Sequence, residues 1–300
     1  MSRQINDKNK KRREAGRPAG VHRTIQRQRL QIKQATSRKK PWKNSPSKRS
    51  SPPTGAIPGI IFQPQREVGN QILNVEKLAS SVDGRVLFDK ATFSVNKGDK
   101  IAFLSKDPLA VTNFFEIITG NKKAEKGQFE WGTTITSAYL PLENSEFFTG
   151  NLNLLDWLRQ YVPAYVTDAD EPFLRGFLGK MLFSGDDILK KTNVLSGGEK
   201  VRCMISRMML QQPNLVILDQ PTNHLDLESI QSFNEGCQNF PGIVLMTSHD
   251  HTFIQTVANR IIELTPNGVI DRLMTFDEYL ADDRVKNLKA EMYNEKATAR

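Results

Sequence analysis

Residues 195–230 read LSGGEKVRCMISRMMLQQPNLVILDQPTNHLDLESI, and this stretch decides the fold. A glycine-containing turn comes first, then a segment with one apolar face, then a short run made only of apolar residues. Such a run is typical of a strand buried on both faces of a parallel sheet. Strands that alternate with helices predict an α/β fold with ligands at the strand carboxyl ends. The expected helices cover 109–119, 198–211 and 226–239, and the expected buried strands cover 100–104, 215–218, 243–246 and 261–264.

The remaining elements follow from shorter patterns. Strands are expected over 71–78, 91–96, 127–131 and 135–140. The segment 151–190 is expected to be mainly helical, because its apolar residues recur at helical spacing. The globular domain is expected over 67–284, with a C-terminal extension at 285–300.

Charge is distributed unevenly along the chain. Residues 1–66 contain 18 Lys and Arg against 2 acidic residues, whereas the remainder contains 24 basic and 31 acidic residues. A basic tail on a mildly acidic globule indicates a polyanionic partner, most often a nucleic acid. A solvated tail with no partner is the alternative. The tail is expected to be disordered or partly helical near 21–40, with a proline-rich linker at 41–66. The candidate RNA-binding residues are Arg27, Arg29, Lys33, Arg38, Lys39 and Lys40.

Composition excludes some classes of protein. No apolar run reaches the roughly 18 residues that a membrane-spanning helix needs, and the N-terminus has no apolar signal segment. Cys203 and Cys237 show neither a disulfide framework nor metal-ligand spacing. We therefore expect a cytoplasmic protein that does not enter a membrane. The arginine-rich, acid-poor start leaves a mitochondrial transit segment open.

The turn Ser196-Gly197-Gly198-Glu199 carries the first functional signal. Glycines let a backbone approach a phosphate, and the first N–H groups of a helix supply donors to it. With the strand and PTNHLD that follow, the segment resembles the signature loop of ATP-binding cassettes. The resemblance implies a P-loop NTPase-like cassette with a mixed sheet and a helical signature subdomain. It also implies that these four residues contact ATP held by a second cassette, and it places Asp226 among the nucleotide-binding residues.

The catalytic positions of that family can be matched one by one. Asp219 ends an apolar strand, as a Mg²⁺-holding carboxylate does, and Thr112 is the second residue implied for the metal. The family's glutamate, which positions the attacking water, is replaced by Gln220. An amide cannot accept a proton, and loss of a general base typically costs ~10²–10⁴ in rate. His249 follows the strand 243–246 and matches the switch histidine that contacts the γ-phosphate, whereas His224 is expected to be structural.

The phosphate loop departs from the family pattern. A loop of the form G-x-x-x-x-G-K-[ST] is expected between a strand and a helix, but Ser105 and Ala110 replace its glycines and Val111 replaces its lysine. A lost charged hydrogen bond costs roughly 1.5–3 kcal/mol. The adenine-stacking aromatic and the glutamine-loop residue are also replaced, by Val82 and Leu142. ATP and Mg²⁺ are therefore expected to bind weakly or only with a partner cassette.

PTNHLDLES and the lack of a membrane segment resemble the ABC-F branch, in particular a YbiT-like subgroup. ABC-F proteins join two cassettes by a basic linker and bind the ribosome, near tRNA and rRNA. The resemblance covers 67–284 and, more weakly, 31–66, which matches a second cassette and the end of the linker. It implies a homo- or heterodimer in which this chain supplies a signature loop to its partner, while its own ATPase activity is weak or absent. A non-catalytic RNA- or ribosome-binding scaffold, a fragment of a full-length ATPase and a transporter cassette are the alternatives.

Overall fold

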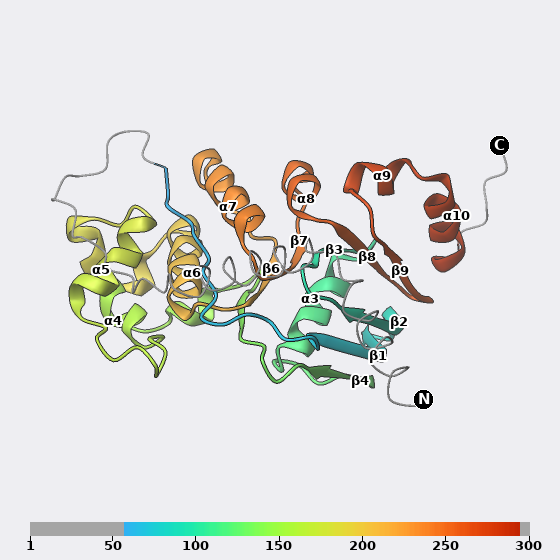
Figure 1. The fold of residues 1–300 in the computed structure, drawn as a ribbon, viewed down its shortest axis with the longest axis horizontal. Coiled ribbons are helices and arrows are strands. Elements are labelled where there is room, and N and C mark those ends of the chain that lie inside the picture. Colours follow the sequence, from blue (N-terminus) through green and yellow to red (C-terminus); the bar gives the residue numbers. More distant parts are fainter. Residues whose placement is uncertain (1–56, 295–300) are drawn as a thin grey trace, which may run out of the picture. The chain divides into compact units, whose positions relative to one another are not determined.

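A computed structural model describes residues 57–294 of the chain. Its centre is a six-stranded sheet in the order β5-β6-β7-β3-β8-β9, in which all neighbouring pairs are parallel except β8 and β9 (Figure 1). The α/β fold with a mixed sheet is therefore confirmed. The strands are β3 (Lys100–Leu104), β5 (Ser137–Leu140), β6 (Leu215–Asp219), β7 (Ile243–Thr247), β8 (Arg260–Thr265) and β9 (Gly268–Arg272).

A second, antiparallel sheet has the order β2-β1-β4, formed by β1 (Leu73–Val82), β2 (Arg85–Val95) and β4 (Lys126–Trp131). Strands β1 and β2 are longer than expected and form one hairpin. Its two-residue turn, Asp83-Gly84, has φ values of 51° and 78°. An Asp-Gly pair with two positive φ values matches the twist of the strands it joins, and this signal was missed in the sequence.

The helices cover both faces of the six-stranded sheet. Helix α3 (Pro108–Ile118) packs on one face, and α7 (Leu227–Asn239) and α8 (His251–Val257) pack on the other (Figure 1). The expected helical segment at 151–190 contains α4 (Leu154–Arg159), α5 (Glu171–Lys180) and 3₁₀ turns, and it packs against α6 (Gly197–Gln211). Two further helices end the described chain, α9 (Phe276–Ala281) and α10 (Asp283–Met292).

Alternate residues of each central strand enter different cores. In β6, Val216 and Leu218 lie in the core under α6 and α7, whereas Leu215 and Ile217 lie in the core with α3 and the three-stranded sheet. All four are fully buried. The expectation of a strand buried on both faces is confirmed, and the burial fixes the strand whose end carries Asp219.

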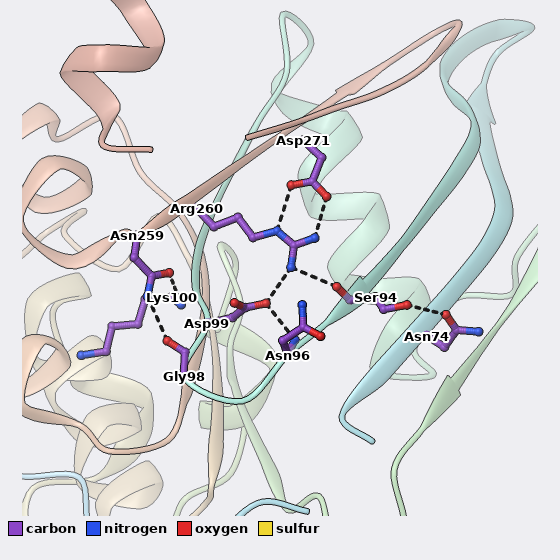
Figure 2. A network of polar contacts seen from close by, with 9 residues as sticks. All are labelled: Asn74, Ser94, Asn96, Gly98, Asp99, Lys100, Asn259, Arg260 and Asp271. Carbon is purple, nitrogen blue, oxygen red and sulfur yellow. Dashed lines mark hydrogen bonds and ion pairs between the residues drawn. The ribbon is translucent and has the colours of Figure 1, made fainter. Parts of the chain in front are cut away.

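A charged network joins the two sheets (Figure 2). Arg260, at the start of β8, donates to both carboxylate oxygens of Asp271 on β9, at 2.8 and 2.5 Å. One of its terminal nitrogens also donates to Asp99, at 2.6 Å, and to the carbonyl oxygen of Ser94 on β2, at 3.0 Å. The pKa of Arg260 is raised chiefly by its hydrogen bond to Asp271. The planar guanidinium thus holds β2, β8 and β9 together.

The packed part of the chain begins before residue 67. Ile60 and Phe62 are buried, and the Phe62 ring lies 6.1 Å from that of Phe233 on α7. The carbonyl oxygen of Ile60 lies so close to α7 that a Cβ at Gly236 would be 2.8 Å from it. The end of the proline-rich segment is therefore fixed on α7. The candidate RNA-binding residues Arg27 to Lys40 lie outside the described residues.

Candidate nucleotide-binding site

Three strand ends bring the expected site residues to one edge of the six-stranded sheet. Strands β3, β7 and β6 are neighbours and parallel. Ser105 follows β3, Asp219 ends β6, and His249 follows β7 by one residue. The carboxyl ends of parallel strands are where α/β sheets hold ligands. The fold therefore assembles at this edge three of the positions that the sequence singled out: Ser105, Asp219 and His249.

Asp219 is buried with no hydrogen-bond partner on either carboxylate oxygen among the described residues. Burial raises its pKa to about 6. The nearby Thr112 hydroxyl, although it does not meet hydrogen-bond geometry with either oxygen, opposes this rise, and the charge of Glu116 adds to it. A buried carboxylate with two unsatisfied oxygens is costly unless a cation or donor meets it. Asp219 and Thr112 thus fit a hard cation such as Mg²⁺, which prefers oxygen ligands.

The Tyr139 hydroxyl on β5 is also buried without a partner among residues 57–294. Its pKa is raised by burial and by the negative charge of Asp219. The site therefore contains three unsatisfied polar atoms, two from Asp219 and one from Tyr139. Tyr139 was not singled out in the sequence, where it reads as an ordinary strand residue.

Gln220 holds the switch segment through its side chain. Its side-chain amide oxygen accepts the backbone N–H of His249 at 3.0 Å. The backbone N–H of Gln220 donates to the carbonyl oxygen of Thr247 at 3.0 Å. The residue has a φ of 50°, which few side chains other than Asn and Asp adopt. The His249 side chain is exposed. Gln220, at the position where the family has its glutamate, thus links the ends of β6 and β7 through hydrogen bonds.

The segment expected as a phosphate loop is folded as the capped start of α3. The helix begins at Pro108, and the side chain of Asp107 accepts the N–H of Leu109 at 3.1 Å. The Asp107 carbonyl accepts the N–H of Ala110 at 3.0 Å. Pro108 has no N–H to offer. The backbone N–H groups of Leu109 and Ala110, which could otherwise donate to a phosphate, are therefore already hydrogen-bonded to Asp107. The Asp107 carboxylate also places a negative charge at the helix N-terminus.

Two further contacts close this loop. The Arg85 guanidinium lies 2.9 Å from the carboxylate of Asp107. Arg85 follows the hairpin turn next to Val82, the position expected to stack on adenine, so the ion pair joins the two segments that the family resemblance predicts to border a nucleotide. Val111, at the expected lysine position, is 2% exposed and packs in the core beneath the three-stranded sheet.

The end of α10 contacts the same loop. The Tyr293 hydroxyl accepts the N–H of Lys106 at 3.1 Å and lies 3.2 Å from the carbonyl oxygen of Leu264, to which it donates. The Lys106 ammonium lies 4.3 Å from the centre of the Tyr293 ring. Nearby, Lys289 of α10 forms an ion pair of 2.8 Å with the buried Glu263. Lys106, which is off register for a phosphate-loop lysine, is thus held by the C-terminal helix.

The signature loop keeps its expected geometry. Ser196 caps α6, and Glu199 completes a capping box by accepting the Ser196 N–H at 2.9 Å. A Cβ at Gly198 would lie 2.6 Å from the carbonyl oxygen of His224, so only glycine fits there. Gly197 packs on the His224 ring. His224 therefore has a structural role: it packs against the two signature glycines, Gly197 and Gly198.

Asp226 has a local role in the structure. Its carboxylate accepts the N–H of Ser229 at 2.8 Å and caps α7, and these contacts lower its pKa. Asp226 could still border a ligand, but one of its carboxylate oxygens is already hydrogen-bonded to the Ser229 N–H.

Among residues 57–294, no cluster of three or more His, Cys, Asp or Glu has the arrangement of a metal site. None of the described helices has the length and apolar character needed to cross a bilayer.

Sequence reasoning missed four residues of this site: Arg85, Asp107, Tyr139 and Tyr293. Asp107-Pro108 was readable, because Asp before Pro is a signature of an N-cap followed by the first helical residue. The contact between Tyr293 and Lys106 has no local signal, since the two residues are far apart in the sequence.

Comparison with known proteins agrees with this fold. A family described as "ABC transporter" matches residues 88–223. A Bacillus subtilis protein described as an uncharacterized ABC transporter ATP-binding protein, YkpA, is 53% identical over 88% of this chain and 48% of its own length. The probable ATP-binding protein YbiT of Escherichia coli O157:H7 is 34% identical over 74% of the chain and 42% of its own length.

The energy-dependent translational throttle protein EttA of Escherichia coli K12 is 26% identical over 71% of the chain and 38% of its own length. The chain thus spans less than half the length of each of these three relatives. A solved ATP-binding subunit of an ABC transporter superposes with a TM-score of 0.58 over 74% of this chain and 99% of its own, at 19% identity. The fold, the family match over residues 88–223 and these relatives together show that the globular part of the chain has the fold of an ABC-type ATP-binding cassette.

Proposed function

We propose that the chain is an ABC-F-type cassette that acts in translation at the ribosome, and that it offers its signature loop to a partner cassette while its own phosphate side stays closed. The observation that carries this proposal is the contrast between two helix starts. The start of α6 is glycine-rich and shaped by His224, whereas the start of α3 is capped by Asp107.

The closed phosphate side follows from charge and hydrogen bonding. A phosphate at the start of α3 would meet the Asp107 carboxylate and would find no N–H on Pro108. It would also have to displace Arg85 and Tyr293. Cassettes of this class use ATP and Mg²⁺, and here Asp219 and Thr112 fit the metal but the loop does not fit the phosphates. We therefore assign no hydrolysis to this site.

The ribosome part of the proposal rests on the relatives and on charge. EttA is named as a translational throttle protein. YbiT, at 34% identity, represents the subgroup that the sequence motifs resemble. The basic residues at 1–66, including Arg27, Arg29 and Lys33, supply the charge that RNA binding needs. A ribosomal partner would place the protein in the cytoplasm.

One experiment tests the supply of the signature loop. The purified chain is mixed with the part of YkpA that it does not match, and phosphate release from Mg-ATP is measured. We expect the chain alone to be inactive and to accelerate its partner's turnover. The Gly198→Ala variant should lose that acceleration, since a Cβ there meets His224. No acceleration by the wild-type chain would contradict the proposal.

A non-catalytic RNA-binding scaffold is the second candidate. It is favoured by the number of contacts that hold the phosphate loop without nucleotide, namely those of Asp107, Arg85 and Tyr293. In that case the chain binds RNA but leaves the partner's ATPase rate unchanged.

A further inference from the structure

The outer face of the three-stranded sheet carries a concave pocket of about 790 Å³. Each strand contributes one lysine to it: Lys77 from β1, Lys90 from β2 and Lys126 from β4. The remaining lining residues are Glu76, Asp89, Thr92, Gly127 and Gln128. The globule as a whole has a negative net charge, whereas this pocket has three lysines against two acidic residues.

The backbone at this pocket is distorted in all three strands. Lys77 and Lys90 have φ values of 50° and 52°, and Gly127 has a φ of 79°. The strand register shifts at the same places, between Val75 and Ala79 of β1. A bulge turns a side chain in a new direction, and non-glycine residues in the left-handed region concentrate at functional sites. Here the two strained residues are both lysines that line one pocket.

Specific contacts hold the distorted backbone in place. The Thr92 hydroxyl accepts the N–H of Lys77 at 3.0 Å and donates to the carbonyl oxygen of Lys90 at 3.2 Å. A Cβ at Gly127 would lie 2.3 Å from the Lys77 carbonyl oxygen, so β4 passes close to the bulge only because residue 127 is glycine. The Thr92 hydroxyl and Gly127 therefore stabilise the backbone positions from which the Lys77 and Lys90 side chains extend.

Within the described chain the three lysines are not held in ion pairs, although the charge of Lys126 is near enough to Glu125 to contribute to lowering the pKa of that exposed carboxyl, which is lowered chiefly by hydrogen bonds from Ser81. None of the three forms an ion pair with a residue of 57–294. The Glu76 carboxylate accepts amide hydrogen bonds from Asn74, at 3.0 Å, and Gln128, at 2.9 Å. Asp89 is the other acidic lining residue. Three lysines therefore share the pocket with two carboxylates, Glu76 and Asp89, and that of Glu76 is already hydrogen-bonded to two amides of the sheet.

We propose that this pocket binds the phosphodiester backbone of RNA, an inference that rests on the proposed action at the ribosome. Adjacent strands lie about 4.8 Å apart, so lysines on three neighbouring strands can meet successive phosphates, whereas a single phosphate would engage fewer of them. The lining residues include no aromatic side chain to stack on a base. The contact is therefore to the backbone and independent of sequence.

Lysine footprinting on the full chain tests the inference directly. The protein is acetylated with an amine-reactive ester, with and without purified ribosomal RNA, and modification is followed at each lysine by mass spectrometry. We expect several-fold slower modification of Lys77, Lys90 and Lys126 in the presence of RNA. Three exposed lysines outside the pocket, Lys97, Lys191 and Lys286, are the controls and should react at unchanged rates. Unprotected pocket lysines beside protected lysines of residues 1–66 would overturn the pocket and leave the proposed function standing.

Substitution provides the second test. The K77Q/K90Q/K126Q variant should reduce the salt dependence of RNA affinity, d log K/d log [salt], by about 2, since each lost phosphate contact removes roughly 0.7–0.9. The K97Q/K191Q/K286Q variant changes charge equally and should not alter the slope. Lys126→Gln alone, where the backbone φ is ordinary, should lower the slope by roughly 0.7 and guards against misfolding of the triple variant.

Competition identifies the ligand class. Tripolyphosphate in place of RNA should protect the pocket lysines weakly, and poly-glutamate should not protect them. Stronger protection by either compound than by RNA would overturn the assignment to RNA. A chain that binds neither ribosomal RNA nor ribosomes would contradict both this inference and the proposed function.

Discussion

The hydroxyl oxygen of Tyr293 lies 3.1 Å from the backbone nitrogen of Lys106, so the end of the last described helix occupies a donor of the loop that follows β3. In a working phosphate loop, backbone N–H groups of this kind point at a phosphate. Here a side chain from the same chain meets one of them, and Asp107 meets another. The loop is thus stabilised by protein contacts in place of nucleotide contacts.

Tyr293→Phe tests the first of these contacts. The variant removes hydrogen bonds to Lys106 and Leu264 and should lower the free energy of unfolding by about 1–3 kcal/mol, since each such bond contributes roughly 0.5–1.5 kcal/mol. Urea denaturation measures this change. Tyr165→Phe is the control, because the Tyr165 side chain is 49% exposed, and it should have a smaller effect. Unchanged stability of Tyr293→Phe would show that α10 does not hold the loop.

Asp107→Ala should lower the free energy of unfolding by about 1 kcal/mol, because it removes an N-cap. Asp107→Asn keeps an acceptor for the Leu109 N–H and should be close to wild type. Arg85→Ala should cost little, since the Arg85 side chain is 63% exposed and exposed ion pairs contribute about 0–1 kcal/mol. If Arg85→Ala were the more damaging change, the ion pair and not the cap would dominate.

The unusual pKa of Asp219 predicts a pH dependence of stability. Its pKa is raised to about 6 in the folded chain, chiefly by burial, against about 3.9 when unfolded. The unfolded chain therefore loses this proton first, and stability should fall as pH rises from about 4 to 6, by up to about 3 kcal/mol at 1.36 kcal/mol per pKa unit. Asp219→Asn should be more stable than wild type at pH 7 and should lose this dependence.

Asp226 provides the matched control for that experiment. Its pKa is lowered by hydrogen bonds from Ser229, so its contribution has the opposite sign. The Asp226 carboxylate stabilises the fold at neutral pH, and this contribution to the free energy of unfolding is lost as pH falls through the folded-state pKa of Asp226. Asp226→Asn should therefore be less stable than wild type at pH 7. A stability gain in both variants would point to general charge repulsion instead of burial of Asp219.

Gln220→Glu should not restore ATP hydrolysis by the chain alone. The new carboxylate can still accept the His249 N–H, but the loop around Asp107 remains closed and Val111 remains buried in the core. Phosphate release at saturating Mg-ATP is the measurement. Brisk turnover from this single change would mean that the loop opens readily and that the description of the phosphate side is wrong.

The sequence predicted the parts of the site that lie along one segment. The signature turn, β6 with its terminal Asp219 and the helix expected from residue 226 follow one another within 195–230, where local periodicity and apolar runs determine the elements. The Asp83-Gly84 hairpin was also within reach of local rules. In contrast, the contact of Tyr293 with Lys106 and the aligned bulges at Lys77, Lys90 and Gly127 depend on how distant segments meet, which no local pattern contains.

Co-sedimentation of the full chain with ribosomes, with and without Mg-ATP at low and moderate salt, is the decisive test of the proposed function. We expect binding at low salt that weakens as salt rises and that Mg-ATP leaves unchanged, because the loop at Asp107 and Lys106 is already occupied by protein contacts. Binding that requires Mg-ATP, or no binding at low salt, would contradict it.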